Sequence, residues 1–219
     1  EQLQEVYVSE SFLEKCSCRE HLEEVGYEVV SDSVFSKISD TCTPQGVLCV
    51  LKQFHYNIEE MLRDKAPLFL LLENIQDPGN LGTMLRTGEG AGVSGIIMSR
   101  DTVDLYNPKV IRSTMGSIYR VPFYYADDFA AAVHQVQRAG VSVYAAHLRG
   151  KNSYACQDYT KGTAFLIGNE GNGLREETAE LADCYIRIPM EGKVESLNAA
   201  VASSILMYEA HRQRATIEK

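Results

Sequence analysis

The sequence predicts an α/β protein built on a mostly parallel sheet, with helices on both faces. From Pro67 onward, short apolar segments alternate with amphipathic segments, which is the pattern of strands and crossover helices in such a sheet. Nearly continuous apolar runs, such as those at 69–72 and 165–167, are typical of strands buried on both sides. A chain of 219 residues can hold a small domain and a medium one, and the change of pattern near Pro67 favours that division.

The elements of the larger part follow from these runs. Strands are predicted at 68–72, 95–98, 119–123, 141–145, 164–167 and 184–188. Helices are predicted at 80–90, 108–115, 127–139, 174–182 and 197–212, where apolar residues recur with helical spacing. In the last of these helices, the apolar stripe has small neighbours that would let another helix or a second chain approach closely.

The first part of the chain is interpreted as an incomplete small α/β domain. Helices are predicted at 12–25 and 32–38, and strands at 28–30 and 46–52. The charged segment that follows ends before Pro67 and is predicted to connect the two parts. The predicted division is therefore 1–56, a linker at 57–66, and a domain at 67–219. The N-terminus has neither an initiator Met nor a signal-peptide pattern, and we interpret it as the start of a cropped fragment.

Composition excludes several classes of protein. No apolar run is long enough to cross a bilayer, so no membrane partner is expected. The six cysteines lack paired C-x-x-C spacing, which favours reduced thiols in a cytoplasmic protein and predicts no metal site.

Charge is distributed unevenly along the chain. The net charge of −9 argues against indiscriminate nucleic-acid binding. However, residues 1–65 carry 6 basic and 13 acidic side chains, whereas residues 66–219 carry 15 and 17. Within the later part, basic residues recur near predicted strand ends, where they could assemble one basic face. These residues are Arg86, Arg100, Lys109, Arg112, Arg120, Arg149 and Lys151.

The first candidate site lies at 74–87, where a strand leads through a tight turn into a helix. Pro78 and Gly79 supply the turn, and Asn80 is predicted to cap the helix. Arg86 points away from the buried stripe of this helix and is well placed to hold an RNA phosphate with its planar donor fork. A cap followed by a solvated arginine is an equally acceptable interpretation of the spacing.

A G-x-G-x-x-G string at 90–95 invites a dinucleotide-binding interpretation. In dinucleotide-binding proteins this string follows a strand and opens a helix, so that the helix N-terminus meets the pyrophosphate. Here it closes a predicted helix and opens a strand. The order therefore argues against a dehydrogenase.

The second candidate site is the glycine-rich segment 166–174, again at the carboxyl end of a predicted strand. Its glycines allow a ligand to approach the main chain closely, and no Lys-Ser or Lys-Thr pair follows that would make it a phosphate-binding P-loop. The loop suits a ligand that is recognised by backbone groups, such as an adenine edge or a ribose. Glu170 is either an ordinary turn carboxylate or a group aimed into the site.

The third candidate site is the segment 188–200, which joins the last predicted strand to the last helix. Ser196 is predicted to cap that helix. Ile188, Met190 and Leu197 are candidates for the walls of an adenine pocket, although for each residue taken singly the pattern favours core packing. No hydrolase or metal motif competes with these sites, and His147, at a strand end, is the one histidine of interest.

Taken together, the three segments resemble in order and spacing the motifs of the SpoU/TrmH-type RNA 2'-O-ribose methyltransferases of the SPOUT superfamily. The resemblance runs from about Leu68 to His211. Residues 34–47 also resemble the end of the small ribosomal-protein-like substrate-binding domain that many such enzymes carry, present here in part.

The resemblance implies a fold, a partner and a reaction. The fold is a C-terminal trefoil knot, and the protein is a homodimer whose active site uses both chains. The reaction is methyl transfer from S-adenosylmethionine to a ribose 2'-hydroxyl of RNA, either ribosomal or transfer RNA, without a metal.

The resemblance also assigns site residues by motif position. The implied catalytic residues are Asn80, Arg86, Glu170, Ser196 and Asn198. The implied cofactor-binding residues are Ala145, His147, Gly168, Asn169, Gly171, Ile188, Met190 and Leu197.

In the family, the arginine at position 86 is described as the base. A guanidinium with a pKa above roughly 12 is a poor base, so we favour Arg86 as a clamp for a phosphate. Three alternatives remain open at this point: a non-catalytic RNA-binding or assembly protein on the same fold, a Rossmann-type nucleotide enzyme, and a base methyltransferase.

Overall fold

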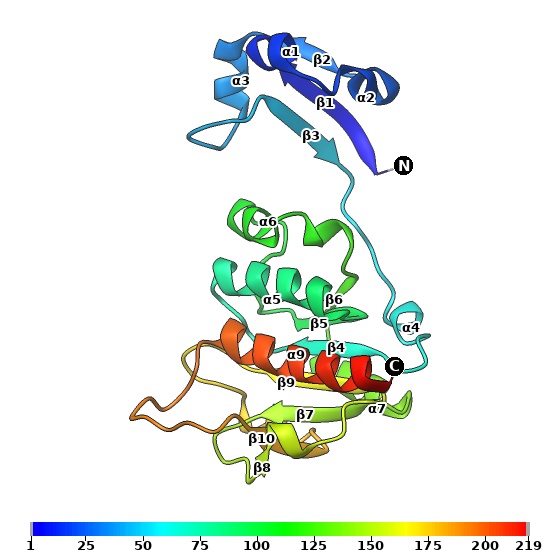
Figure 1. Cartoon of the computed structure of the whole chain (residues 1–219), viewed down its shortest axis with the longest axis vertical. Helices are drawn as coiled ribbons and strands as arrows, with labels where there is room; N and C mark the ends of the chain where they lie inside the picture. Colours follow the sequence, from blue (N-terminus) through cyan, green and yellow to red (C-terminus); the bar gives the residue numbers. More distant parts are fainter. Residues whose placement is uncertain (1, 218–219) are drawn as a thin grey trace. The chain divides into compact units, whose positions relative to one another are not determined.

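The computed structural model describes residues 2–217, and these residues belong to two compact units that divide between His55 and Tyr56 (Figure 1). The N-terminal unit contains β1 (Leu3–Ser9), α1 (Glu10–Lys15), α2 (Arg19–Val25), β2 (Glu28–Val30), α3 (Asp32–Ile38) and β3 (Val47–Leu51). Its sheet has the order β2-β1-β3, in which β1 is parallel to β2 and antiparallel to β3. A small core forms around Val6, Val8 and Leu22.

The N-terminal unit differs from the prediction in two places. Strand β1 was not predicted, because its first residues are polar or exposed and only its second half alternates toward the core. The helix predicted at 12–25 is wrong as a single element. Ser9 caps α1 by accepting a hydrogen bond from the Phe12 N–H, and the extended backbone of Cys16 ends α1 before α2 begins. By contrast, β2 and α3 have the predicted bounds.

The C-terminal unit is a parallel sheet with interleaved helices. Its strands are β4 (Leu68–Leu72), β5 (Gly95–Ser99), β6 (Phe123–Ala126), β7 (Ser142–Ala146), β8 (Asn152–Ser153), β9 (Thr163–Ile167) and β10 (Cys184–Arg187). Its helices are α4 (Ile58–Met61), α5 (Pro78–Ala91), α6 (Pro108–Thr114), α7 (Phe129–Arg138), α8 (Glu176–Ala179) and α9 (Ala199–Ile217). The sheet order is β6-β5-β4-β9-β7-β10-β8, and its described pairings are all parallel. The predicted mostly parallel sheet is confirmed.

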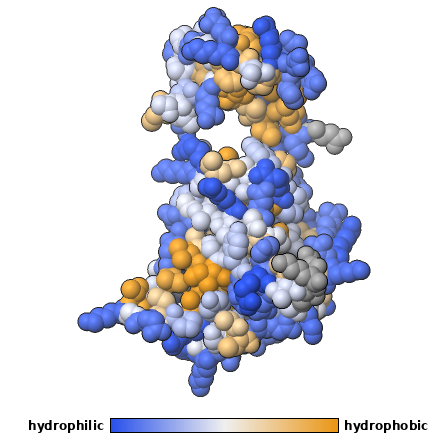
Figure 2. All heavy atoms as spheres, in the orientation of Figure 1, coloured by the Kyte–Doolittle hydropathy of each residue, from blue (hydrophilic) through white to orange (hydrophobic). Residues whose placement is uncertain are grey.

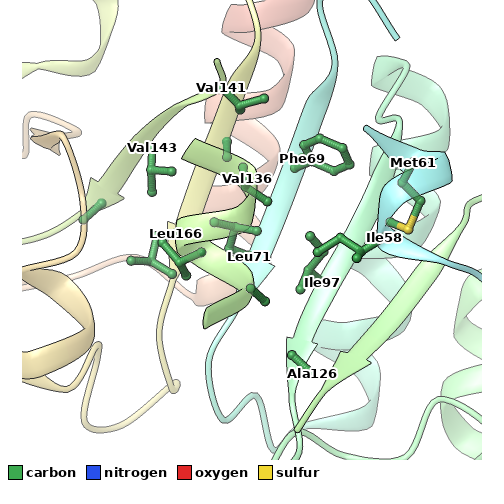
Figure 3. Close-up of a cluster of buried hydrophobic side chains, with 14 of the residues drawn as sticks. Ile58, Met61, Phe69, Leu71, Ile97, Ala126, Val136, Val141, Val143 and Leu166 are labelled. Atoms are coloured by element: carbon green, nitrogen blue, oxygen red, sulfur yellow. The ribbon is translucent and has the colours of Figure 1, made fainter. Parts of the chain in front are cut away.

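Residues on alternate sides of the central strands face two different layers. Phe69 and Leu71 of β4 point into a cluster with Val136 of α7, while Ile58 and Met61 of α4 pack into the same cluster (Figure 3). On the other side, α5 and α9 lie together across β4 and β9 (Figure 1). This arrangement explains why β4 is fully buried along its length.

The strand predicted at 119–123 is wrong. Residues Ser117–Tyr119 form a 3-10 turn, because the N–H groups of Arg120 and Val121 both bond to the Ser117 carbonyl, at 3.0 Å each. Pairing with β5 begins only at Pro122, whose carbonyl accepts from the Ile96 N–H. The edge strand therefore starts at the end of the predicted range.

Further elements also differ from the prediction. The helix predicted at 174–182 is shortened to α8, because the backbone of Arg175 is extended where its N–H bonds to Glu73. The last helix begins at Ala199 and runs to Ile217, and the two-residue strand β8 was not predicted. Among the described residues, no helix is long and apolar enough to cross a membrane.

Candidate functional site

A pocket of about 240 Å³ opens where β7, β9 and β10 end. It is lined by residues 146–148 at the end of β7, by residues 167–174 at the end of β9, and by residues between 186 and 202, which run from the end of β10 into α9. The carboxyl end of a parallel sheet is the usual ligand site of such folds, because several loops converge there. The three loops therefore place the second and third sequence motifs around one cavity.

The loop after β9 is held in a tight form by its own backbone. The N–H groups of Asn169 and Gly173 each bond to the carbonyl of the other, at 3.1 and 2.9 Å. A Cβ on Gly168 would lie 2.2 Å from the main chain of Gly173 and Leu174, so only glycine fits at this position. The N–H groups of Gly171 and Asn172 also donate to the Asn169 side chain, so the loop is held rigidly and its main chain lies along the pocket wall, where a ligand can approach it closely.

Glu170 is a hub that joins this loop to the start of α5. Its carboxylate accepts hydrogen bonds from the N–H groups of Gln76 and Asp77 and from the amide of Asn80, each at 3.0 Å. Burial raises the pKa of Glu170, but the hydrogen bonds from Asn80, Asp77 and Gln76 outweigh it and hold the pKa below its usual value. Glu170 is therefore a charged acceptor that fastens two loops.

Asn80 carries the connection on to the third motif. Its side-chain oxygen accepts from the Asn198 amide at 2.9 Å, while its own amide donates to Glu170. We call these three residues, Glu170, Asn80 and Asn198, the Glu170 network. It joins one residue from each of the three motifs that the sequence singled out.

Both predicted helix caps are wrong, and the correction explains the network. Helix α5 begins at Pro78 with Asp77 as its cap, and Asp77 accepts from the Asn80 N–H at 2.7 Å. Asn80 therefore sits inside the first turn, with its side chain free to bridge two loops. At α9, Asn198 rather than Ser196 accepts from the N–H groups of Ala200 and Val201.

Most of the predicted cofactor-binding residues line the pocket. They are His147, Gly168, Asn169, Gly171, Ile188, Met190 and Leu197, and Glu170 and Ser196 line it as well. Ala145 does not, because successive residues of a strand point to opposite faces. Its side chain is buried in the core beside Val143, and Ala146 lines the pocket in its place.

His147 packs against the ring of Tyr185, with the ring centroids 5.0 Å apart. Burial, together with the charge of Arg149, lowers the pKa of His147. A mostly neutral imidazole at the pocket wall is a packing surface with one polar edge rather than a cation.

Arg86 lies outside this pocket. It is exposed on α5, and it makes no side-chain hydrogen bond or ion pair with the described residues. It follows Asn80 by six positions, which turns its side chain by roughly a third of a helical turn away from the Glu170 network. The structure thus brings Asn80, Glu170 and Asn198 together and leaves Arg86 on the adjoining surface.

Sequence reasoning missed a second brace behind the pocket. The carboxylate of Glu73 is only 1% exposed, and it accepts from the Arg175 N–H at 2.9 Å, from the Arg175 Nε at 2.7 Å and from the Thr178 hydroxyl. This brace ties the end of β4 to the glycine-rich loop and α8. A charged residue directly after five apolar strand residues was the available signal, since a buried carboxylate requires partners.

The lining indicates what the site can hold. Apolar side chains such as Ile188, Met190 and Leu197 form its walls, and glycine-loop main-chain groups form its polar edge. This combination fits a flat ring with polar edges joined to a sugar. Within residues 2–217, no group of three or more His, Cys, Asp or Glu side chains is arranged to hold a metal ion.

Comparison with known proteins gives consistent matches. The sequence model of the SpoU rRNA Methylase family matches residues 67–208. The chain is 35% identical over 180 residues to the 23S rRNA (guanosine(2553)-2'-O)-methyltransferase RlmP of Bacillus subtilis, covering 82% of this chain and 70% of that protein. It is 32% identical over 222 residues to the 23S rRNA (guanosine-2'-O-)-methyltransferase RlmB of Bordetella pertussis, covering 98% and 91%.

A solved structure resembles the chain over most of its length. The AdoMet-bound rRNA methyltransferase from Sinorhizobium meliloti superposes with a TM-score of 0.81 at 33% identity. The match covers 96% of this chain and 80% of that one.

Proposed function

Because the chain belongs to the SpoU rRNA methylase family and is an S-adenosylmethionine-dependent RNA 2'-O-methyltransferase, we propose that its substrate is a ribose of ribosomal RNA, which it modifies in the cytoplasm. Two relatives that cover most of the chain are named 23S rRNA 2'-O-methyltransferases. The single observation that carries the proposal is the Glu170 network, which joins the three motifs beside one pocket.

The pocket residues fit the cofactor by their chemistry. S-adenosylmethionine supplies a methyl group on a positively charged sulfur, which an oxygen nucleophile can displace. Ile188, Met190 and Leu197 would contact the adenine ring, and the main chain of the 168–171 loop would bond to its edge or to the ribose. Asn80, Glu170 and Asn198 would hold the loops that shape this site rather than react themselves.

Arg86 is assigned as the clamp for a phosphate of the RNA. Displacement requires the ribose oxygen to be aligned with the methyl carbon, so a group that fixes the backbone next to the target ribose accelerates the reaction. A guanidinium presents a rigid fork of donors that matches a phosphate and keeps its proton. Glu170 is a poor general base, since its lowered pKa reflects a carboxylate already engaged by three donors.

Two finer features are part of the proposal. The first is a homodimer, supported by a hydrophobic area over the start of α9, where Val201 is 48% exposed (Figure 2). A second chain on this face would cover it and meet Arg86 on α5, which packs against α9. The second is a trefoil knot. It is supported by the close passage of the segment around Gly150 and strand β10, since a Cβ on Gly150 would lie 2.8 Å from the main chain of Ile186.

The N-terminal unit is proposed to help bind the RNA. It is supported by the resemblance of residues 34–47 to part of a ribosomal-protein-like domain, and by the length of the match to the Bordetella pertussis relative, which covers 98% of this chain.

The proposal is tested by transfer of labelled methyl from S-adenosylmethionine to unmodified 23S rRNA and transfer RNA transcripts, followed by nucleoside analysis. We expect label in a 2'-O-methylated nucleoside of the ribosomal transcript. Label in transfer RNA alone would overturn the substrate, and label on a base would overturn the ribose assignment. If neither RNA is labelled, both the proposed substrate and the ribose assignment are overturned.

A further inference from the structure

Ion pairing divides the seven basic residues of the C-terminal unit that the sequence places near strand ends. Arg100 pairs with Asp127, Arg120 with Glu89, and Arg149 with Glu176. A cation that is already paired with a carboxylate attracts a phosphate less strongly, because the carboxylate offsets its charge and occupies its donors. The remaining four, Arg86, Lys109, Arg112 and Lys151, form no side-chain ion pair or hydrogen bond with the described residues.

Two of these cations, Lys109 and Arg112, lie on α6. They are exposed and three positions apart, which makes them neighbours on the helix surface, with Cβ atoms about 5–6 Å apart. We call this pair the α6 cations. The segment 107–116 around them contains no Asp or Glu, although the whole chain has a net charge of −9. Their charge is therefore not neutralised by their own helix.

Helix α6 is fastened to the turn of α5 that carries Asn80. The Ser113 Oγ lies 3.2 Å from the Pro78 carbonyl oxygen, besides the carbonyls of its own helix, and a Cβ on Gly82 would lie 1.8 Å from this Oγ. Only glycine at position 82 allows the two helices to approach so closely. The α6 cations are thus held next to the helix turn that Glu170 and Asn198 contact.

We propose that the α6 cations bind phosphates of the RNA strand that carries the target ribose, at positions other than the phosphate assigned to Arg86, so that they add to RNA affinity rather than to alignment of the ribose. This inference rests on the proposed function. Two adjacent, exposed and unpaired cations on a rigid helix suit consecutive phosphates of one strand, and such contacts fix register without reading sequence. Because the protein is acidic overall, most of its surface repels RNA, and a local pair of unpaired cations provides a place where RNA is attracted.

The test compares the double variant K109Q/R112Q with a matched control, R138Q/K161Q, which removes the same charge from exposed positions elsewhere on the unit. Binding of an unmodified 23S rRNA transcript is measured at several salt concentrations. For the α6 variant, we expect the negative slope of log association constant against log salt concentration to become shallower by about 1–2. The KM for RNA should rise roughly tenfold at moderate salt. The kcat at saturating RNA and the Kd for S-adenosylmethionine should stay unchanged, and the control should behave as the wild type.

Two outcomes overturn the inference: an unchanged salt slope and KM in the α6 variant, or an equal loss in the control. The variant K109R/R112K keeps both charges and should restore the wild-type slope, which separates a charge effect from a folding effect. Unchanged binding in an enzyme that still methylates the transcript refutes only the α6 assignment. Failure of the wild type to methylate any RNA refutes the proposed function, whereas the binding measurement still decides whether the α6 cations hold RNA.

Discussion

At the scale of single residues, Asn80 connects three segments that are far apart in the sequence. Its position in the first turn of α5 leaves both ends of its amide available, one for Glu170 and one for Asn198. A carboxylate at position 80 could only accept hydrogen bonds, and an ammonium group there could only donate them. The bridge therefore requires a side chain with both a donor and an acceptor.

Replacing Glu170 with Gln should loosen the site. The carboxylate has two oxygens for three donors, whereas the amide has one oxygen and places an NH₂ group against an N–H donor. We expect a loss of about 1 kcal/mol in the free energy of unfolding at neutral pH and roughly tenfold weaker binding of S-adenosylmethionine. Urea unfolding and calorimetry measure both.

The pH dependence of the Glu170→Gln variant supplies the control. Because its pKa is lowered in the fold, Glu170 stabilises the protein at pH values above its ordinary pKa of about 4.3. That contribution is lost as the pH falls through the folded pKa. The difference in stability between wild type and variant should therefore shrink from pH 7 toward pH 3. A difference that grows on acidification would contradict the role assigned to Glu170.

Replacing Arg86 with Ala should separate turnover from cofactor binding. The side chain lies outside the pocket, so the Kd for S-adenosylmethionine should change by no more than about twofold, which corresponds to about 0.5 kcal/mol of binding free energy. Loss of the phosphate clamp should lower kcat by about 100-fold or more, since alignment of the ribose depends on it. Arg86→Lys, which keeps the charge but not the planar fork, should recover only part of the rate. Unchanged turnover in Arg86→Ala would remove this residue from the mechanism.

At the scale of elements, strands buried on both sides were predictable and elements shaped by distant contacts were not. The all-apolar run of β4 has the predicted bounds, because burial on both faces leaves a continuous signal in the sequence. The strand predicted at 119–123 fails because a turn centred on the Ser117 carbonyl uses its N–H groups. Helix α8 is short because its predicted first turn is extended where Arg175 bonds to Glu73, a partner 102 positions away. No local pattern carries that information.

The same limit applies to the site. Glycine spacing and the resemblance identified the loops around the pocket, and strand alternation explains why Ala146 rather than Ala145 lines it. The convergence of Glu170, Asn80 and Asn198 could be expected only from the resemblance, because it depends on hydrogen bonds across 90 and 118 positions. The brace at Glu73 was missed because its signal, a charged residue directly after an apolar strand, does not identify the partners Arg175 and Thr178 about 100 positions away.

Helix α9 is fastened near its far end by Gln213, which bonds to the main chain of Gln157 and Tyr159, and above all by Arg214. The guanidinium of Arg214 donates to the carbonyls of Tyr159, Ala66, Pro67 and Lys161, at distances from 2.8 to 3.2 Å. Arg214→Lys should cost about 2–3 kcal/mol of unfolding free energy, because one ammonium cannot span carbonyls from two loops and leaves some of them without a partner. Chemical denaturation measures the loss. Arg212→Lys on the same turn, whose partner Glu209 is local, is the control and should cost less than about 0.5 kcal/mol. Equal effects of the two substitutions would refute a fastening role for Arg214.

At the scale of the whole molecule, the two units have separate cores. The N-terminal core is formed around Val8, and the C-terminal core is formed by β4, β9 and the helices that cover them. The pocket and the Glu170 network lie entirely in residues 56–217. Loss of the N-terminal unit should therefore leave cofactor binding intact and affect only the part of RNA binding that this unit is proposed to supply.

A fragment that begins at Tyr56 should fold and bind S-adenosylmethionine with the affinity of the full chain, while its KM for the ribosomal transcript rises by roughly tenfold or more. The reason is that every pocket contact stays in the fragment, whereas the surface proposed to hold RNA in the N-terminal unit is removed. Calorimetry and methyl-transfer kinetics measure the two effects. In the full chain, Val8→Asp should disrupt only the N-terminal core and give the same split, because an unpaired charge in that small core is too costly to bury. Loss of cofactor binding in either protein would mean that the N-terminal unit helps to build the pocket, and an unchanged KM would remove that unit from RNA recognition.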